Sequence, residues 1–132
     1  MIDWESDPDL KNLRDDFISS LKGRLEKIIL VQEEILNLGI SSERIYEGQI
    51  IAHSLAGIAE TYGFPILTLI AAKLDDFLDF CSKNYPTHEI LEFMNLLELA
   101  LKETVKGGID SRILLEDVRM KRLTFAVESL LD

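Results

Sequence analysis

Apolar residues recur along this chain with a helical period, and no segment shows the two-residue alternation of a half-buried strand. The first predicted helix begins at Asp7, a capping residue, and Pro8 suits its first helical position. Gly39 ends this helix, whereas Gly23, inside it, either kinks the helix or splits it. Its predicted apolar stripe consists of Leu10, Leu13, Phe17, Leu21, Leu25, Ile28 and Ile35.

Two further helices follow at short intervals. The second comes after the stretch GISSE, with Ser41 or Ser42 as its cap, and is predicted to run to Tyr62–Gly63. The third opens at Pro65. Its apolar residues have the spacing of a packed bundle helix: Leu67, Ile70, Ala71, Leu74, Phe77, Leu78 and Cys81.

The rest of the chain is also predicted to be helical. Thr87 caps a fourth helix, which closes at Gly107–Gly108. The tail holds at least one more helix, while the path of residues 109–119 stays open. The apolar positions of these two helices are Ile90, Met94, Leu97, Leu101 and Val105 in the fourth, and Leu123, Val127, Leu130 and Leu131 in the tail.

Long amphipathic helices joined by short connections favour antiparallel neighbours. We therefore expect an all-α fold, an up-down antiparallel four-helix bundle with an appended C-terminal fifth helix, and one domain over residues 1–132. The tail also carries apolar residues beyond what four helices need: Leu114, Leu115, Val118 and Phe125. They either bury the fifth helix against the bundle or form a dimer interface, and we expect the first arrangement and a monomer.

Composition narrows the classes of partner. The formal net charge of −10 argues against binding to nucleic acid or to an anionic membrane surface. No apolar run approaches the roughly 20 residues that cross a bilayer, and the acidic N-terminus is wrong for a signal peptide. Cys81 is the single cysteine, so no internal disulfide can form and a cytoplasmic location is expected. His53, His88 and Cys81 show no metal-ligand spacing, and no metal or cofactor is expected.

A helical wheel of the second helix places His53 on the exposed side. The predicted buried stripe is Ile51, Leu55, Ile58 and Tyr62, and the neighbours of His53 on the opposite side are Gln49, Ala56, Gly57 and Glu60. A glycine inside an exposed helix costs about 1 kcal/mol relative to alanine. Gly57 is thus expected to leave room for a bulky group on the imidazole, or for another protein to approach the ring.

These residues match a known pattern. His53, Leu55, Gly57 and Gly63 fit HxLxGxxxxxG, and so the chain resembles histidine-containing phosphotransfer domains. Over Ile51 to Phe80 it looks most like the N-terminal phosphotransfer domain of chemotaxis histidine kinases. The resemblance implies a helical bundle whose histidine carries a phosphoryl group between a histidine kinase and a receiver aspartate of a response regulator.

The resemblance also assigns site residues. An acidic residue twenty-two positions after the histidine hydrogen-bonds the imidazole in that family, and Asp75 has this place here; a solvated helix-face charge is the alternative. The family usually has a lysine three residues after the histidine, and this chain has Ala56. A phosphoryl group adds about −1.5 to −2 charges. Glu60 and Asp75 would then repel it, because their charge has the same sign.

Three interpretations remain open at this point. In the first, the chain is a phosphoryl carrier: His53, neutral near pH 7, attacks through one ring nitrogen and Asp75 fixes the tautomer. It has no ATP-binding motif of its own, so it relays phosphate either alone or as the front part of a histidine kinase. In the second, it is a degenerate domain that docks a receiver or kinase without being phosphorylated, as Ala56 favours. Ile50, at the edge of the exposed face, would serve docking in either case. The third is a scaffold bundle unrelated to phosphotransfer.

Overall fold

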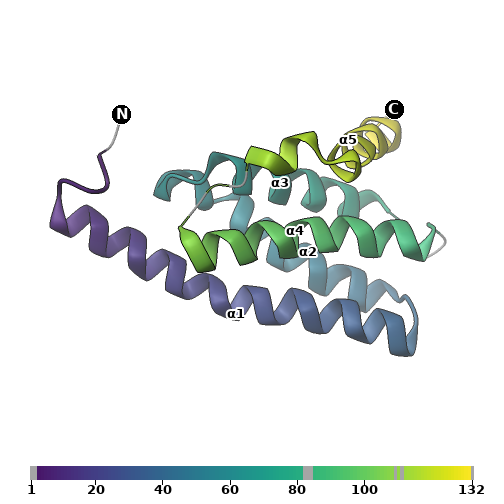
Figure 1. The fold of residues 1–132 in the computed structure, drawn as a ribbon. Helices are drawn as coiled ribbons and strands as arrows, with labels where there is room; N and C mark the ends of the chain where they lie inside the picture. The colour runs from purple at the N-terminus through teal and green to yellow at the C-terminus, as the bar shows by residue number, and fades with distance from the viewer. Residues whose placement is uncertain (1–2, 82–84, 109, 111, 132) are drawn as a thin grey trace.

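A computed structural model describes residues 3–81, 85–108, 110 and 112–131, and this part of the chain is all-α with no strand. Its α helices are α1 (Pro8–Leu38), α2 (Ser42–Ala56), α3 (Pro65–Phe80), α4 (Thr87–Gly107) and α5 (Val118–Leu131) (Figure 1). Two short 3₁₀ turns, η1 (Ala59–Tyr62) and η2 (Arg112–Glu116), precede α3 and α5. The existence of the predicted helices is thus confirmed. The tail segment whose path stayed open includes the turn η2.

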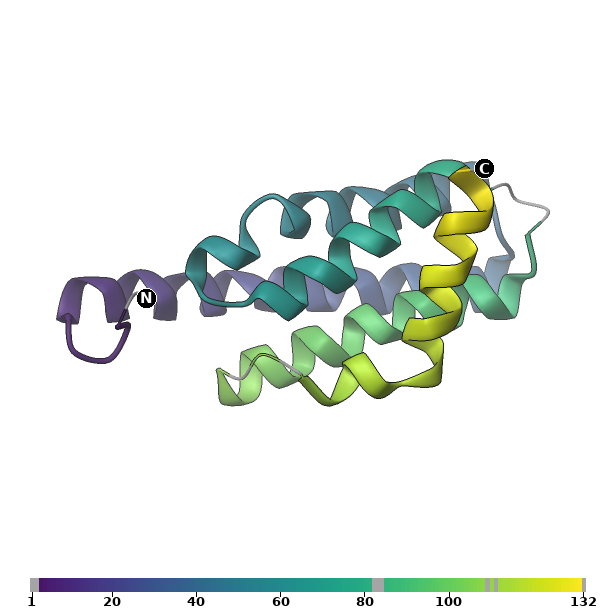
Figure 2. The same ribbon diagram turned by 90° about the horizontal axis from the view of Figure 1, so that it is seen from above.

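The long helix α1 has the predicted ends. The Asp7 carboxylate accepts a hydrogen bond from the Asp9 backbone N–H at 2.9 Å, and Gly39, with φ of 93°, follows the last turn. The helix runs unbroken through Gly23, so of the two alternatives left open there, a kink or a split, the split is excluded. Leu13 is exposed instead of buried, because the first turns of α1 extend beyond the other helices (Figure 2).

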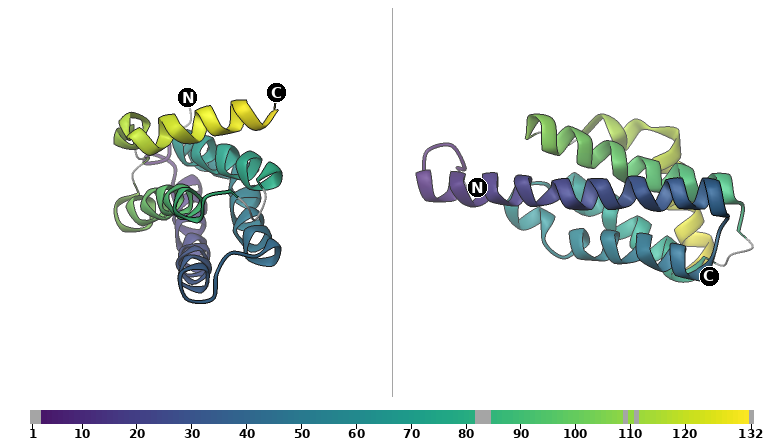
Figure 3. Two further views of the ribbon diagram at one scale, coloured as in Figure 1. Left: turned by 90° about the vertical axis from the view of Figure 1, so that its right-hand side faces the viewer. Right: turned by 90° about the horizontal axis from the view of Figure 1, so that it is seen from below.

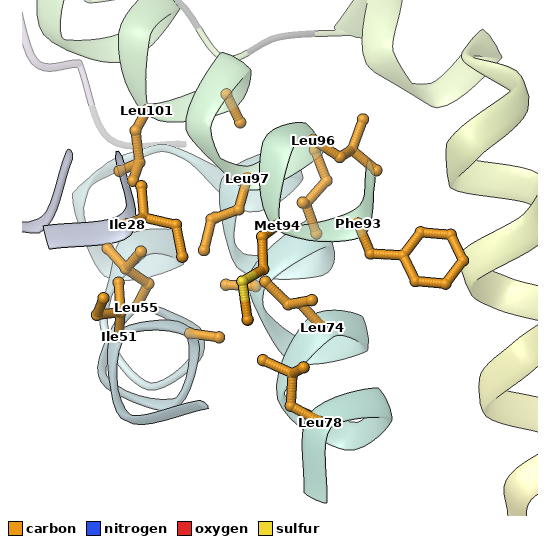
Figure 4. Close-up of a cluster of buried hydrophobic side chains, with 14 of the residues drawn as sticks. Ile28, Ile51, Leu55, Leu74, Leu78, Phe93, Met94, Leu96, Leu97 and Leu101 are labelled. Carbon is orange, nitrogen blue, oxygen red and sulfur yellow. The ribbon is translucent and has the colours of Figure 1, made fainter. Parts of the chain in front are cut away.

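Four helices surround one core. α1 contacts α2 and α4, and α3 contacts the same two helices, as the end-on view in Figure 3 shows. The side chains between them are fully or almost fully buried and include Ile28, Ile51, Leu55, Leu74, Met94 and Leu97 (Figure 4). Such burial of apolar area is the main favourable contribution to folding.

The fifth helix packs on the same molecule. α5 contacts α3 and α4, and it buries Met120, Leu123, Ala126 and Val127. Arg119 donates to Asn95 of α4 at 2.8 Å, and Arg122 pairs with Glu89 and Glu92 of the same helix. The extra apolar residues of the tail behave differently from one another: Leu114 is buried, whereas Leu115, Val118 and Phe125 are exposed.

The end of α2 differs from the prediction. The helix stops at Ala56, and residues 57–63 form a tighter turn in which Thr61 N–H bonds Ile58 C=O at 3.1 Å and Gly63 N–H bonds Glu60 C=O at 3.0 Å. This turn rotates the chain so that Ala59 is fully buried while Ile58 is exposed. Ile58 therefore does not belong to the buried stripe, and the expectation of a helix continuing to Tyr62–Gly63 is wrong.

Two long-range contacts hold the turn and the start of α3. Gly63 has φ of 91°, a left-handed conformation that suits glycine, and a Cβ there would lie 2.8 Å from Trp4 Nε1. Asp110 accepts hydrogen bonds from the backbone N–H groups of Ile66 at 2.9 Å and Leu67 at 3.0 Å. Since α3 has no capping side chain at Phe64, Asp110 caps it from more than forty residues away.

Candidate functional site

The exposed imidazole of His53 is bonded to a largely buried carboxylate. His53 lies in the last turn of α2, and its side chain is 78% exposed, as the helical wheel predicted. Its Nδ1 lies 2.9 Å from Oδ2 of Asp75, which comes from α3 and whose side chain is 17% exposed. The predicted pair is thus brought together by two adjacent helices.

This contact selects one tautomer of the neutral ring. An ionised carboxylate only accepts hydrogen bonds, so the bond to Asp75 requires the hydrogen on Nδ1. The lone pair of the neutral ring is then on Nε2. Among the described residues Nε2 has no hydrogen-bond partner, and the high exposure of the side chain makes it accessible. Such a nitrogen is a nucleophile presented to a second molecule.

A second carboxylate belongs to the same cluster. Gln49, one turn before His53 on α2, donates from Nε2 to Asp75 Oδ1 at 3.2 Å and to Asp79 Oδ1 at 3.1 Å. The sequence interpretation named Gln49 as a neighbour of His53 but missed Asp79. The available signal was the spacing of Asp79, four residues after Asp75 and so on the same face of α3.

The other predicted neighbours have different surroundings. Ala56 is half-buried and packs against the core, and Glu60 is exposed on η1. Gly57 is exposed directly after the end of α2, and a Cβ there would meet only backbone oxygens at 3.9 Å. The expectation that Gly57 lies inside the helix is therefore wrong: α2 ends at Ala56, so the cost of a glycine in a helix interior does not apply to it. The space beside it is nevertheless open.

The cluster is acidic. Among the described residues, neither Asp75 nor Asp79 forms an ion pair with a lysine or an arginine. Lys73 lines a pocket with Leu115 and Met120 beside α5, on another side of α3. Ala56 carries no charge, and among the described residues no lysine or arginine contacts the His53 side chain.

A groove adjoins the histidine helix on the side of α1. Its volume is about 510 Å³, and Ile50, which is 50% exposed, lines it together with Leu30, Arg24 and Ser54. Arg24 donates from Nε to the Ser54 hydroxyl at 3.0 Å, so a cation lies next to the residue that follows His53. The docking role of Ile50 stays a prediction, with this groove as its structural setting.

Other groups with possible chemistry lie apart from this cluster. Burial raises the pKa of the Cys81 thiol to about 11, so it is not a nucleophile at neutral pH. His88 is exposed in the first turn of α4. Within the described ranges, no three His, Cys, Asp or Glu side chains are grouped to hold a metal ion, and no helix is both long and apolar enough to traverse a bilayer.

Comparisons of the chain with known protein families, with curated proteins and with solved structures found no match in any of the three.

Proposed function

We propose that this chain is a histidine phosphotransfer domain, which accepts a phosphoryl group on His53 from a histidine kinase and passes it to a receiver aspartate of a response regulator. The observation that carries the proposal is the pairing of an exposed imidazole with a largely buried carboxylate at 2.9 Å. This geometry leaves Nε2 free to meet a partner protein. We also propose that the chain is monomeric and cytoplasmic.

The arrangement of the helices supports the proposal. We infer that the mutual contacts of α1, α2, α3 and α4 represent the up-down antiparallel four-helix bundle of these domains, with α5 appended. In such a bundle the histidine helix and the carboxylate helix are neighbours, and their side chains meet at the surface.

The chemistry follows from the tautomer. The Nε2 lone pair attacks the phosphorus of a donor, either ATP in a kinase or an aspartyl phosphate in a receiver. A P–N bond forms, the P–O bond to the leaving group breaks, and the leaving oxygen takes its electron pair. The proton on Nδ1 stays in place, so the ring becomes cationic, and the Asp75 carboxylate stabilises that charge. Return to an aspartate reverses these bonds.

Ala56 affects the product more than the nucleophile. The phosphoryl group adds about −1.5 to −2 charges at neutral pH, beside the acidic residues Asp75 and Asp79. Without a lysine at position 56, the phosphorylated state is less stabilised, and transfer to an acceptor is correspondingly favoured. A short-lived phosphohistidine is the expected consequence.

The alanine at position 56, where the family usually has a lysine, also favours a second function. A degenerate domain would use the surface around His53 and Ile50 to dock a kinase or a receiver, without accepting phosphate. The groove of about 510 Å³ beside Ile50 supports this alternative. It shares the docking partners of the first function and differs only in the chemistry at Nε2.

Phosphorylation by a small molecule separates the two functions. The chain is incubated with phosphoramidate, a histidine phosphoryl donor, and its intact mass is measured. One added phosphoryl group that is lost in acid, absent in His53→Gln and present in the control His88→Gln, supports the carrier. No added mass, or equal addition in wild type and His53→Gln, contradicts it and favours the docking domain.

A further inference from the structure

Gln49 joins two carboxylates of the neighbouring helix through one amide group. Its Nε2 donates to Asp75 Oδ1 at 3.2 Å and to Asp79 Oδ1 at 3.1 Å. A primary amide nitrogen has two hydrogens and a carboxylate only accepts, so these contacts use both donors and determine which way the amide faces. One residue of α2 thereby binds two consecutive turns of α3.

The Asp75 carboxylate is consequently held at both oxygens. Oδ1 accepts from Gln49, and Oδ2 lies 2.9 Å from His53 Nδ1. Because the two oxygens belong to one planar group, a rotation that breaks the bond to Gln49 also moves Oδ2 relative to the imidazole. Gln49 therefore restrains the carboxylate in the orientation that the ring nitrogen uses.

The like charges of Asp75 and Asp79 give this restraint a physical reason. Asp75 and Asp79 lie one turn apart on α3, and like charges at that spacing repel each other. Within the described residues no lysine or arginine pairs with Asp75 or Asp79. The amide of Gln49 donates to both anions while leaving the negative charge of Asp75 available to the imidazole. A cation in its place would partly cancel that charge.

We propose that Gln49 is a positioning residue for His53, acting through Asp75 and anchored by Asp79. By holding Asp75 on the Nδ1 hydrogen, it keeps Nε2 as the unprotonated, nucleophilic nitrogen. This inference rests on the proposed function of His53 as phosphoacceptor. Gln49 itself touches neither the donor nor the phosphorus.

Gln49→Met tests the role, because methionine has a similar length and no hydrogen-bond donor. The matched control is Gln32→Met: the Gln32 amide bonds Glu98 of α4 at 2.8 Å, away from the His53 cluster. Two readouts are taken on each protein. The ¹⁵N chemical shifts of the His53 ring report the tautomer, and the rate of mass gain with phosphoramidate reports nucleophilic reactivity.

In wild type we expect one protonated nitrogen, Nδ1, and one bare nitrogen, Nε2. In Gln49→Met the two shifts should move toward a common averaged value. The phosphorylation rate should fall about threefold to tenfold, the scale of one ordinary hydrogen bond, since Gln49 acts on the rate only through the orientation of Asp75. Gln32→Met should change neither readout.

The double variant shows whether Gln49 acts through Asp75. In the Asp75→Asn background, Gln49→Met should lower the rate no further. Unchanged ring shifts, or an equal fold loss in that background, would overturn the inference. If wild type gains no phosphoryl group, the proposed function fails, and the ring shifts alone decide the role of Gln49.

Discussion

The carboxylate of Asp110 holds the first turn of α3, the helix that supplies Asp75. It accepts from Ile66 N–H at 2.9 Å and from Leu67 N–H at 3.0 Å. The first N–H groups of a helix have no partner within the helix, and no side chain at Phe64 caps α3. Asp110→Ala removes both acceptors and the negative charge, and water replaces them only in part because the contacts are partly buried.

The size of the effect follows from these two contributions. A capping side chain is worth about 0.5–2 kcal/mol, and a negative charge at a helix N-terminus adds about 0.3–1 kcal/mol. We therefore expect Asp110→Ala to lower the free energy of unfolding by about 1–3 kcal/mol. Asp110→Asn retains one acceptor oxygen and should lose about half of that.

Urea unfolding followed by far-UV circular dichroism measures this loss, with the m-value unchanged. Asp76→Ala is the matched control, since Asp76 is an exposed aspartate of the same helix. Surface substitutions of that kind usually stay within about 0.5 kcal/mol of wild type. If Asp110→Ala lies in the same range as Asp76→Ala, the cap contributes nothing and the reasoning is refuted.

Three other predictions concern single positions. Ala56→Lys should lengthen the lifetime of phosphohistidine at pH 7 by about twofold to fivefold, since an exposed charge pair is worth up to about 1 kcal/mol. The lifetime is measured as the loss of the added mass, and an unchanged value would show that the absence of a lysine at position 56 does not destabilise phosphohistidine. Gly63→Ala should lower the free energy of unfolding, measured in urea, by about 1–2 kcal/mol because Gly63 has a left-handed backbone. Gly23→Ala, inside α1, should raise it by about 0.5–1 kcal/mol, and equal effects of the two changes would be inconsistent with the turn geometry. The Cys81 thiol, with its pKa raised by burial to about 11, should alkylate at pH 9 about fiftyfold more slowly than in the urea-unfolded chain; comparable rates would show that burial does not protect it.

Much of the helical content could be predicted because its signals are local. Asp7, Ser41 and Pro65 mark helix starts by their own side chains, and the structure has helices beginning directly after or at them. The exposure of His53 was predictable for the same reason. The wheel depends only on residues near Ile51 and Leu55, which are indeed buried.

What sequence reasoning missed depends on contacts between distant segments. The cap of α3 comes from Asp110, and the anchor of Gln49 is Asp79 on the next helix. No local pattern marks Asp110, and the spacing of Asp79 after Asp75 gives only the face of α3 on which it lies. The packing of the helices is what brings both carboxylates within bonding distance of their partners. The end of α2 was missed because an apolar residue, Ile58, continues the helical period after the chain has already turned at Gly57.

The position of the phosphoryl group on the ring tests the central claim most directly. The chain is phosphorylated with phosphoramidate, and ¹H–³¹P correlation NMR detects which ring protons couple to phosphorus. Nε2 is bonded to both carbons that carry ring hydrogens, Cδ2 and Cε1, whereas Nδ1 is bonded to only one of them, Cε1. The account predicts coupling to both ring protons in wild type and no signal in His53→Gln. Coupling to the Cε1 proton alone, or an unphosphorylated His53, would contradict it.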